Sequence, residues 1–228
     1  ALGQGRRGPG SRDGRAEESG AGRGEVRLNL SRVLIIKPSS LGDVIQALPV
    51  AWALRDLKPR ARIDWLVMPS CAGAVEGVKA IDHVLLFDRK HYGRMWRNPL
   101  TAASFLWFLS KLRHPRYTTV LDLQGLFRSG FLAYASGAER RVGLAGSREG
   151  ADRFYTDVVP VPEEPMSSVD RYMLTASALG APSEGPRRFG KSKKKRPDLP
   201  QVILALAINR DGLPIRHWVF PGNRVDVT

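Results

Sequence analysis

The stretch R-V-L-I-I-K-P-S-S-L-G-D-V-I-Q-A-L-P, residues 32–49, decides the fold of this chain. Residues 33–36 form a short, continuous apolar run, which is typical of a strand buried on both faces in a parallel sheet. Pro38 ends that strand, because proline donates no hydrogen bond to a neighbouring strand. Ser40 and Asp43 fit the S-x-x-D pattern of a helix start. The stretch therefore predicts a strand, a tight loop and a helix N-terminus, the place where open α/β sheets bind ligands.

The helix predicted after Ser40 places Val44, Leu48 and Trp52 on one face. Pro49 lies inside this helix. Because proline removes a backbone hydrogen bond and crowds the preceding turn, we expect it to kink the helix or to delay its regular part.

Strand-like and helix-like segments alternate along the chain as far as residue 179. We expect further strands at residues 62–67, 83–87, 118–123, 140–143 and 157–161, and helices at 70–78, 100–112, 126–135 and 167–179. This alternation indicates βαβ units with right-handed crossovers, and so an α/β fold with a parallel sheet. The helix at 100–112 is almost entirely apolar. Burial against the sheet is its default interpretation, and a face that touches a membrane is the alternative.

The two ends of the chain differ in composition from its middle. Residues 1–30 are rich in Gly and Arg and poor in large apolar side chains, so we predict a disordered basic tail. A G-x-G-x-x-G match within it follows no strand, and we reject it as a dinucleotide site. Residues 31–183 form the predicted domain, and 184–200 read as a basic linker. Residues 201–207 resemble a new strand, so 201–228 are expected to be the truncated start of a second domain.

The formal net charge of +14 suggests an anionic partner. Seven of the positive charges lie between Arg187 and Arg196, in a stretch without acidic residues. This cluster fits a solvated linker, and attraction to anionic lipid head groups is the next interpretation. Nucleic acid is the least supported partner, because the cluster lacks the interleaved aromatic residues of a single-strand binding surface.

Cysteine and histidine usage argues against a metal site. The single cysteine, Cys71, allows neither an internal disulfide nor a cysteine-rich zinc site, and the four histidines show no metal-ligand spacing. A lone cysteine also fits a reducing compartment. No apolar run approaches the roughly 18–20 residues that cross a bilayer, and the N-terminus lacks the apolar segment of a secretory signal.

Asp43 has two interpretations. It can be the acidic residue of a capping box, favoured in the first turn by the helix dipole. It can also be a general base at a cleft, where Ser39, Ser40 and the backbone of Gly42 leave room for a substrate. One carboxylate can do both.

Four stretches, in this order, resemble the heptosyltransferases of glycosyltransferase family nine. They are most similar to members that add the first heptose to the lipopolysaccharide inner core. The second stretch corresponds to the family's Asp-x-Gln-Gly-Leu element followed by a basic residue, and the third carries its Arg-Glu pair. The four stretches are I-I-K-P-S-S-L-G-D-V-I-Q-A-L-P (35–49), V-L-D-L-Q-G-L-F-R-S (120–129), R-V-G-L-A-G-S-R-E-G-A (141–151) and R-F-Y (153–155).

The resemblance implies the N-terminal half of a GT-B type glycosyltransferase, with a Rossmann-like parallel sheet and helices on both faces. In such an enzyme the N-terminal domain binds the acceptor, and the C-terminal domain binds the donor ADP-heptose. The implied reaction inverts the anomeric centre and needs neither a metal nor a cofactor. The implied acceptor is an anionic glycolipid, Kdo-lipid A. The protein would be cytoplasmic and peripheral at the anionic surface of the inner membrane.

Carried over by position, the resemblance makes Asp43 the general base that takes the proton of the acceptor hydroxyl. It makes Lys37, Gln124, Arg128 and Arg148 candidates to hold the anionic acceptor, together with Ser39, Ser40 and Gly42 around the base. Arginine forks and a lysine charge suit carboxylates and phosphates.

Each of the four acceptor candidates also has a structural interpretation. Lys37 can be a surface lysine at the end of its strand, and Gln124 can satisfy backbone groups there. Arg128 can be a solvated residue at a helix start. Arg148 and Glu149 can form a surface ion pair that contributes little.

Three rival functions remain open. The chain can be a non-catalytic remnant with the same fold, since most of a donor domain is missing. It can be a basic module that binds anions or nucleic acid through the cluster at 187–196. It can be another nucleotide-binding protein, although no glycine fingerprint follows the first strand.

Overall fold

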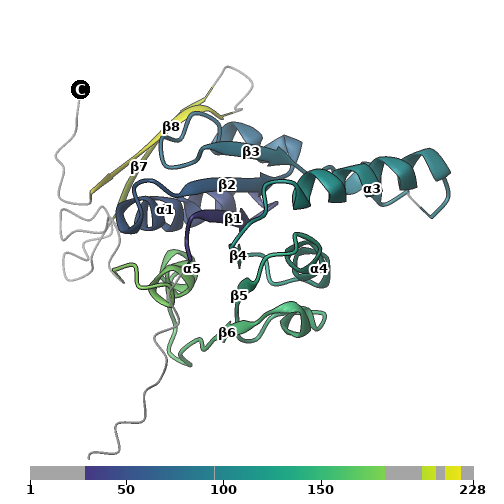
Figure 1. The fold of residues 1–228 in the computed structure, drawn as a ribbon. Coiled ribbons are helices and arrows are strands. Elements are labelled where there is room, and N and C mark those ends of the chain that lie inside the picture. The colour runs from purple at the N-terminus through teal and green to yellow at the C-terminus, as the bar shows by residue number, and fades with distance from the viewer. Residues whose placement is uncertain (1–28, 95, 183–201, 209–213, 222–228) are drawn as a thin grey trace, which may run out of the picture.

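The structure is a computed structural model that describes residues 29–94 and 96–182, and the backbone of residues 202–208 and 214–221 (Figure 1). The predicted linker and nearly all of the predicted tail lie outside the described residues. Leu30, which we assigned to the tail, is buried in the core. The folded domain therefore begins slightly earlier than the sequence suggested.

Six parallel strands form one sheet in the order β3-β2-β1-β4-β5-β6. The strands are β1 (Arg32–Ile36), β2 (Arg62–Val67), β3 (His83–Leu86), β4 (Thr119–Asp122), β5 (Arg140–Leu144) and β6 (Asp157–Val159). The chain winds outward from β1 in one direction and then returns to β4 on the other side. This reversal confirms the predicted Rossmann-like α/β fold, and it creates a topological switch point between β1 and β4.

Helices cover both faces of the sheet (Figure 1). One layer holds α1 (Leu41–Leu57) and α5 (Ser168–Ser177), and the other holds α3 (Pro99–Arg113) and α4 (Phe127–Ala135). Shorter turns are the 3-10 helices η1 (Pro69–Ala74) and η2 (Ala151–Phe154) and the helix α2 (Arg89–Tyr92). In the part of the chain that the structure describes, no helix is long and apolar enough to cross a membrane.

The position of β1 at the centre of the sheet explains why its residues are all apolar after Arg32. Val33 and Ile35 join the core beneath α1 and α5, whereas Leu34 and Ile36 join the core beneath α3 and α4. Because successive side chains of a strand point to opposite faces, a strand covered on both sides must be apolar at every position.

Helix α1 begins at Leu41, immediately after Ser40, and continues through Pro49 to Leu57. The expected delay of its regular part is therefore wrong. Pro49 removes only the hydrogen bond to the fourth residue before it. Its ring is buried in the core together with Val44 and Leu48, and this packing keeps the helix in place.

The predicted helix at residues 70–78 is instead the shorter η1, which starts with Pro69 at its first position. Gly77 has φ of 77°, a conformation that favours glycine and turns the chain before a longer helix can form.

Helix α3 corrects another expectation. Within it only Thr101, Phe108 and Leu112 are buried, and the large side chains of Leu100, Leu106 and Trp107 are exposed. The default interpretation of burial against the sheet is wrong for most of this helix. The reason is geometric, because α3 extends beyond the sheet and only its last turns reach the core (Figure 1).

Two further strands, β7 (Val202–Ile208) and β8 (Pro214–Pro221), form an antiparallel pair. The strand expected at residues 201–207 is thus present as β7. Its partner β8 lies in a stretch where the sequence showed no periodicity.

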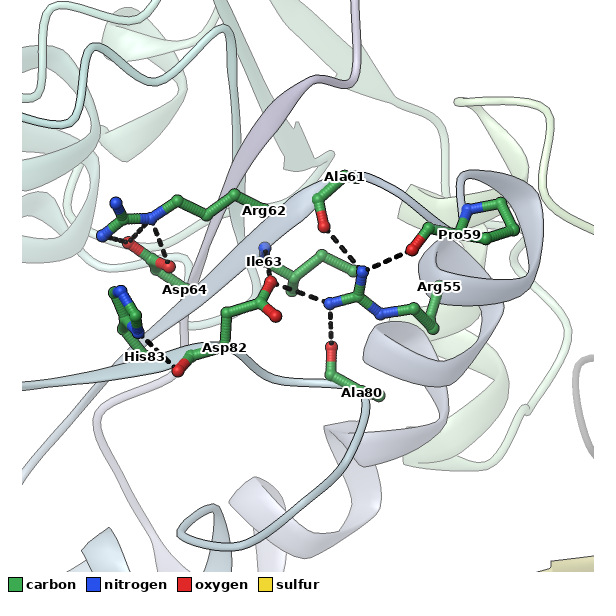
Figure 2. A network of polar contacts seen from close by, with 9 residues as sticks. All are labelled: Arg55, Pro59, Ala61, Arg62, Ile63, Asp64, Ala80, Asp82 and His83. Atoms are coloured by element: carbon green, nitrogen blue, oxygen red, sulfur yellow. Dashed lines mark hydrogen bonds and ion pairs between the residues drawn. The ribbon is translucent and has the colours of Figure 1, made fainter.

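At the amino end of the sheet, Arg55 links α1 to the loops that precede β2 and β3 (Figure 2). Its guanidinium donates to the carbonyl oxygens of Pro59 at 2.9 Å and Ala61 at 2.6 Å, and to the Asp82 carboxylate at 2.8 Å. The same carboxylate accepts the backbone N–H of Ile63 at 2.7 Å. The network satisfies several backbone groups at once and fixes the starts of both strands.

Beside that network the carboxylate of Asp64 is fully buried within β2. Arg62 donates to both of its oxygens at 3.0 Å, and the hydroxyl of Tyr117 donates at 2.6 Å. A buried carboxylate depends on such donors, because its desolvation is otherwise uncompensated.

We predict that Tyr117→Phe lowers the free energy of unfolding by about 1–3 kcal/mol, because it removes one donor from a buried carboxylate. Chemical denaturation followed by circular dichroism measures the change. Tyr134→Phe is the matched control, since Tyr134 is exposed and water can replace its contacts. Equal effects of the two substitutions would contradict the prediction.

Candidate active site

The candidate base, Asp43, stands in the first turn of α1 at the carboxyl end of β1. Its Oδ2 accepts hydrogen bonds from the backbone N–H of Ser40 at 3.2 Å and from the Ser40 hydroxyl at 3.0 Å. Asp43 is therefore part of a capping box, as one of its two interpretations predicted. The side chain of Asp43 is still 41% exposed, so the same carboxylate faces solvent. A Cβ added to Gly42 would meet no atom within 4 Å, which leaves open space beside it.

Lys37 is the residue that follows β1, and it is buried rather than at the surface. Its Nζ lies 3.9 Å from Oδ2 of Asp43 and 4.9 Å from the centre of the Tyr172 ring. The carboxylate of Asp122, at the end of β4, adds a further favourable interaction. The interpretation of Lys37 as a solvated surface lysine is thus wrong, because the ammonium group sits among carboxylates and an aromatic face.

The pKa values of Lys37 and Asp43 both lie below their ordinary values, for different reasons. Burial lowers the pKa of Lys37, and the charges of Asp43 and Asp122 oppose this only in part. For Asp43, burial acts to raise the pKa, but the Lys37 charge and the hydrogen bonds from Ser40 and Tyr172 outweigh it, so the pKa lies below its ordinary value. Asp43 is consequently ionised at neutral pH, the form that accepts a proton.

Tyr172 brings α5 into the site. Its hydroxyl donates to Oδ1 of Asp43 at 3.4 Å, a long contact. Burial and the nearby Asp43 charge raise the pKa of Tyr172 to about 12, which keeps its hydroxyl protonated. Sequence reasoning missed this residue, because nothing near it in the sequence points to Asp43. Only the packing of α5 against α1 on one face of the sheet joins them.

Asp122 shapes the turn that follows β4. Its Oδ1 accepts the backbone N–H groups of Gln124 at 2.9 Å and Gly125 at 3.2 Å, and its Oδ2 accepts the Tyr155 hydroxyl at 2.7 Å. Burial raises the pKa of Asp122, against the effect of these donors. The Tyr155 ring can reach it only over Gly143, where an added Cβ would lie 2.1 Å from the ring. Asp122 belongs to a motif that the sequence displayed, although we did not single it out.

A groove opens beside this turn, with a volume of about 40 Å³. Ser39, Gln124 and Arg128 line it, and Arg89 from α2 joins them. The Oε1 atom of Gln124 is buried and has no hydrogen-bond partner within the described part of the chain. A buried acceptor without a donor is uncommon in proteins and suits a ligand that supplies one. The interpretation of Gln124 as a residue that only satisfies backbone groups does not account for this atom.

A larger groove of about 590 Å³ shares four residues with the first, including Arg89 and Arg128. Its walls are mostly aromatic. The structure therefore places Arg128 at the junction of a polar groove and an aromatic one. Those aromatic walls comprise Phe87, Tyr92, Trp96, Phe105, Phe127 and Phe131.

Arg148 is the last of the candidate residues along the chain. Its side chain is exposed and lines neither groove, and its backbone N–H donates to the Gly125 carbonyl at 2.8 Å. The neighbouring Glu149 accepts the Phe127 backbone N–H at 3.3 Å and lines the larger groove. The structure thus gathers Lys37, Ser40 and Asp43 at one point and Ser39, Gln124 and Arg128 at the next. Within the described residues, no group of three or more His, Cys, Asp or Glu side chains is placed to hold a metal ion.

Comparison with known proteins shows which family this chain resembles. Residues 106–205 match the family model of glycosyltransferase family 9 (heptosyltransferase). The chain is 32% identical over 193 residues to lipopolysaccharide heptosyltransferase 1 of Pseudomonas aeruginosa, covering 82% of this chain and 54% of that protein. It is 30% identical over 196 residues to the Salmonella typhimurium enzyme of the same name, covering 82% and 61%.

A solved structure agrees. The Escherichia coli heptosyltransferase WaaC, with ADP-2-deoxy-2-fluoro heptose, superposes with a TM-score of 0.61 at 27% identity, covering 67% of this chain and 49% of that one. The chain thus spans between half and two thirds of the length of the curated relatives described above. By sequence and by fold, it is similar to the heptosyltransferases of glycosyltransferase family 9.

Proposed function

We propose that this chain is the acceptor-binding half of an enzyme that transfers heptose from ADP-heptose to the Kdo-lipid A inner core of lipopolysaccharide. One observation carries the proposal. The carboxylate of Asp43 is ionised, faces solvent and accepts hydrogen bonds from Ser40. The residue before Ser40, Ser39, lines a groove together with Gln124, Arg89 and Arg128. The names of the relatives support the choice of reaction, and the nucleotide sugar in the WaaC structure supports the class of donor.

The two grooves suit an anionic glycolipid. They run from Ser39 and Gln124, through Arg89 and Arg128, to aromatic side chains such as Phe105. Kdo-lipid A has the same order of chemistry, with a sugar carboxylate, then phosphates, then acyl chains. Arginine binds carboxylates and phosphates with paired hydrogen bonds, so the junction is the natural place for these charges.

In the proposed reaction, an acceptor hydroxyl oxygen attacks the anomeric carbon of the heptose. The new C–O bond forms as the bond to the diphosphate breaks, and ADP leaves with the electron pair. Asp43 takes the proton of the attacking hydroxyl from the face opposite the leaving group, which gives inversion. Lys37 keeps Asp43 ionised until the proton arrives. The proposal includes no metal and no cofactor, and the donor is held by the C-terminal domain.

We further propose that the enzyme works at the cytoplasmic face of the inner membrane, as a peripheral protein. A lipid-linked acceptor requires the site to approach the bilayer surface.

One experiment tests the proposal. Binding of Kdo-lipid A is measured with this chain alone, and transfer from ADP-heptose, here and for the variants below, is measured with the chain joined to a donor-binding domain. Acceptor binding together with transfer supports the proposal. Failure to bind the acceptor, or binding without transfer in the joined protein, rejects it.

We predict that Asp43→Asn reduces transfer by roughly 10²–10⁴-fold, the usual contribution of a general base, with acceptor binding kept. Asparagine can still accept hydrogen bonds from Ser40, so the helix start survives. Asp170→Asn is the matched control, because Asp170 occupies the same position after Ser167 at the start of α5. Near-normal transfer by Asp43→Asn would reject the base role.

We predict that Lys37→Met moves the acid limb of the pH–rate profile to higher pH. Asp43 must be ionised to act, so activity is lost as the pH falls through its pKa. Lys37 contributes the largest of the interactions that hold this pKa down, so removing its charge raises the pKa. Lys58→Met, an exposed lysine at the other end of α1, should leave the profile in place. An unshifted acid limb in Lys37→Met would show that Asp43 does not set it.

A further inference from the structure

The outer surface of α3 and the turn before it expose large apolar side chains. Trp96 is 87% exposed, Leu100 78%, Leu106 66% and Trp107 61%. These four residues, which we call the α3 outer face, make up half of the eight exposed large apolar residues in the described part of the chain. Such a concentration on a water-soluble surface usually marks an interaction site.

The geometry keeps this face open. α3 extends past the sheet on the side where β3 ends, and its first turns lie away from the body of the domain (Figure 1). Leu100 and Trp107 lie about two helical turns apart and so point to the same side. Phe108 and Leu112 lie on the opposite side and anchor the helix to the core.

The charges carried by the segment that includes α3 and the turns before it have one sign. Residues 89–113 contain six basic residues and no Asp or Glu: Arg89, Lys90, Arg94, Arg97, Lys111 and Arg113. The Nζ of Lys111 lies 3.6 Å from the centre of the Trp107 ring, which joins a cation to one of the exposed aromatic residues. Tryptophan and leucine flanked by lysine and arginine are typical of helices that lie in the interface of an anionic membrane.

The face is also continuous with the proposed acceptor groove. Trp96 belongs to the α3 outer face and lines the larger groove together with Phe105 and Arg89. A lipid surface that contacted Trp96 and Leu100 would therefore lie at the mouth of that groove. A lipid-linked acceptor could then pass from the bilayer into the groove without exposing its acyl chains to water.

We propose that the α3 outer face docks this domain on the surface of an anionic lipid bilayer, with Trp96, Leu100, Leu106 and Trp107 at the acyl boundary and the surrounding basic residues at the head groups. The proposal deepens the proposed function by assigning the membrane contact to a particular face. Docking needs neither donor nor acceptor, so it can be tested separately from transfer.

The test is sedimentation of the full chain with vesicles of phosphatidylglycerol and phosphatidylethanolamine, compared with vesicles of phosphatidylcholine alone. We expect binding to the anionic vesicles and a weakening of at least about tenfold in the double variant Leu100→Ser, Trp107→Ser. Neither Leu100 nor Trp107 lines either of the two grooves described above. The double variant also keeps every basic residue of the chain. Any binding by the cluster at 187–196 is therefore the same in wild type and variant.

A second double variant tests the charges. Arg94→Glu with Arg97→Glu should weaken binding to the anionic vesicles by at least about tenfold, since each basic residue near a membrane contributes about fivefold. Val158→Ser is the matched control, because Val158 is an exposed apolar residue on β6, at the opposite edge of the sheet. It should bind as wild type does, and the thermal unfolding midpoints of all variants should agree.

Three results would overturn the proposal. The first is wild-type protein that does not sediment with the anionic vesicles. The second is equal binding by wild type and the Leu100→Ser, Trp107→Ser variant. The third is a lipid-free dimer that this variant dissociates, which would make the face a contact between two copies. Because the vesicles contain no Kdo-lipid A, failure of transfer leaves each of these results readable.

Discussion

A buried ammonium group organises the carboxyl edge of this domain. Lys37 leaves the central strand with its side chain inside the protein, where desolvation lowers its pKa. The charge is tolerated because Asp43 and Asp122 compensate it and the Tyr172 ring lies against it. These partners come from α1, β4 and α5, so a single cation fixes the relative positions of three elements. A buried charge that loses a partner is strongly destabilising, which makes the arrangement hard to vary.

The same interaction gives Asp43 its chemical character. A capping carboxylate at a helix start is ordinarily a structural group, and here it also faces solvent with its pKa held low. The helix start aims it, and the buried cation keeps it ionised. The structural role of Asp43 and its proposed chemical role therefore both depend on its contact with Lys37.

The amino and carboxyl ends of the sheet differ in the contacts that their polar side chains make. At the amino end, the terminal nitrogens of Arg55 and the buried carboxylate of Asp64 bind neighbouring protein groups (Figure 2). At the carboxyl end, the buried Oε1 of Gln124 lacks a partner among the described residues, and the aromatic groove stays open. The amino end thus joins elements of the protein to one another, whereas the carboxyl end offers an acceptor atom and apolar walls to a ligand.

The sequence by itself determined the α/β fold, the position of Asp43 at the first strand-to-helix turn and the neighbourhood of Gln124 and Arg128. Apolar periodicity, proline and the S-x-x-D pattern are local in sequence, and each constrains the backbone close to it. Only the tertiary structure decided that Lys37 is buried, that Tyr172 contacts Asp43 and that the side chain of Arg148 lines neither groove, because these depend on how distant segments pack. It also decided that α3 leaves its apolar side chains exposed. An apolar run shows that burial of its side chains would be favourable. Whether they are buried depends on how far the sheet extends beneath the helix.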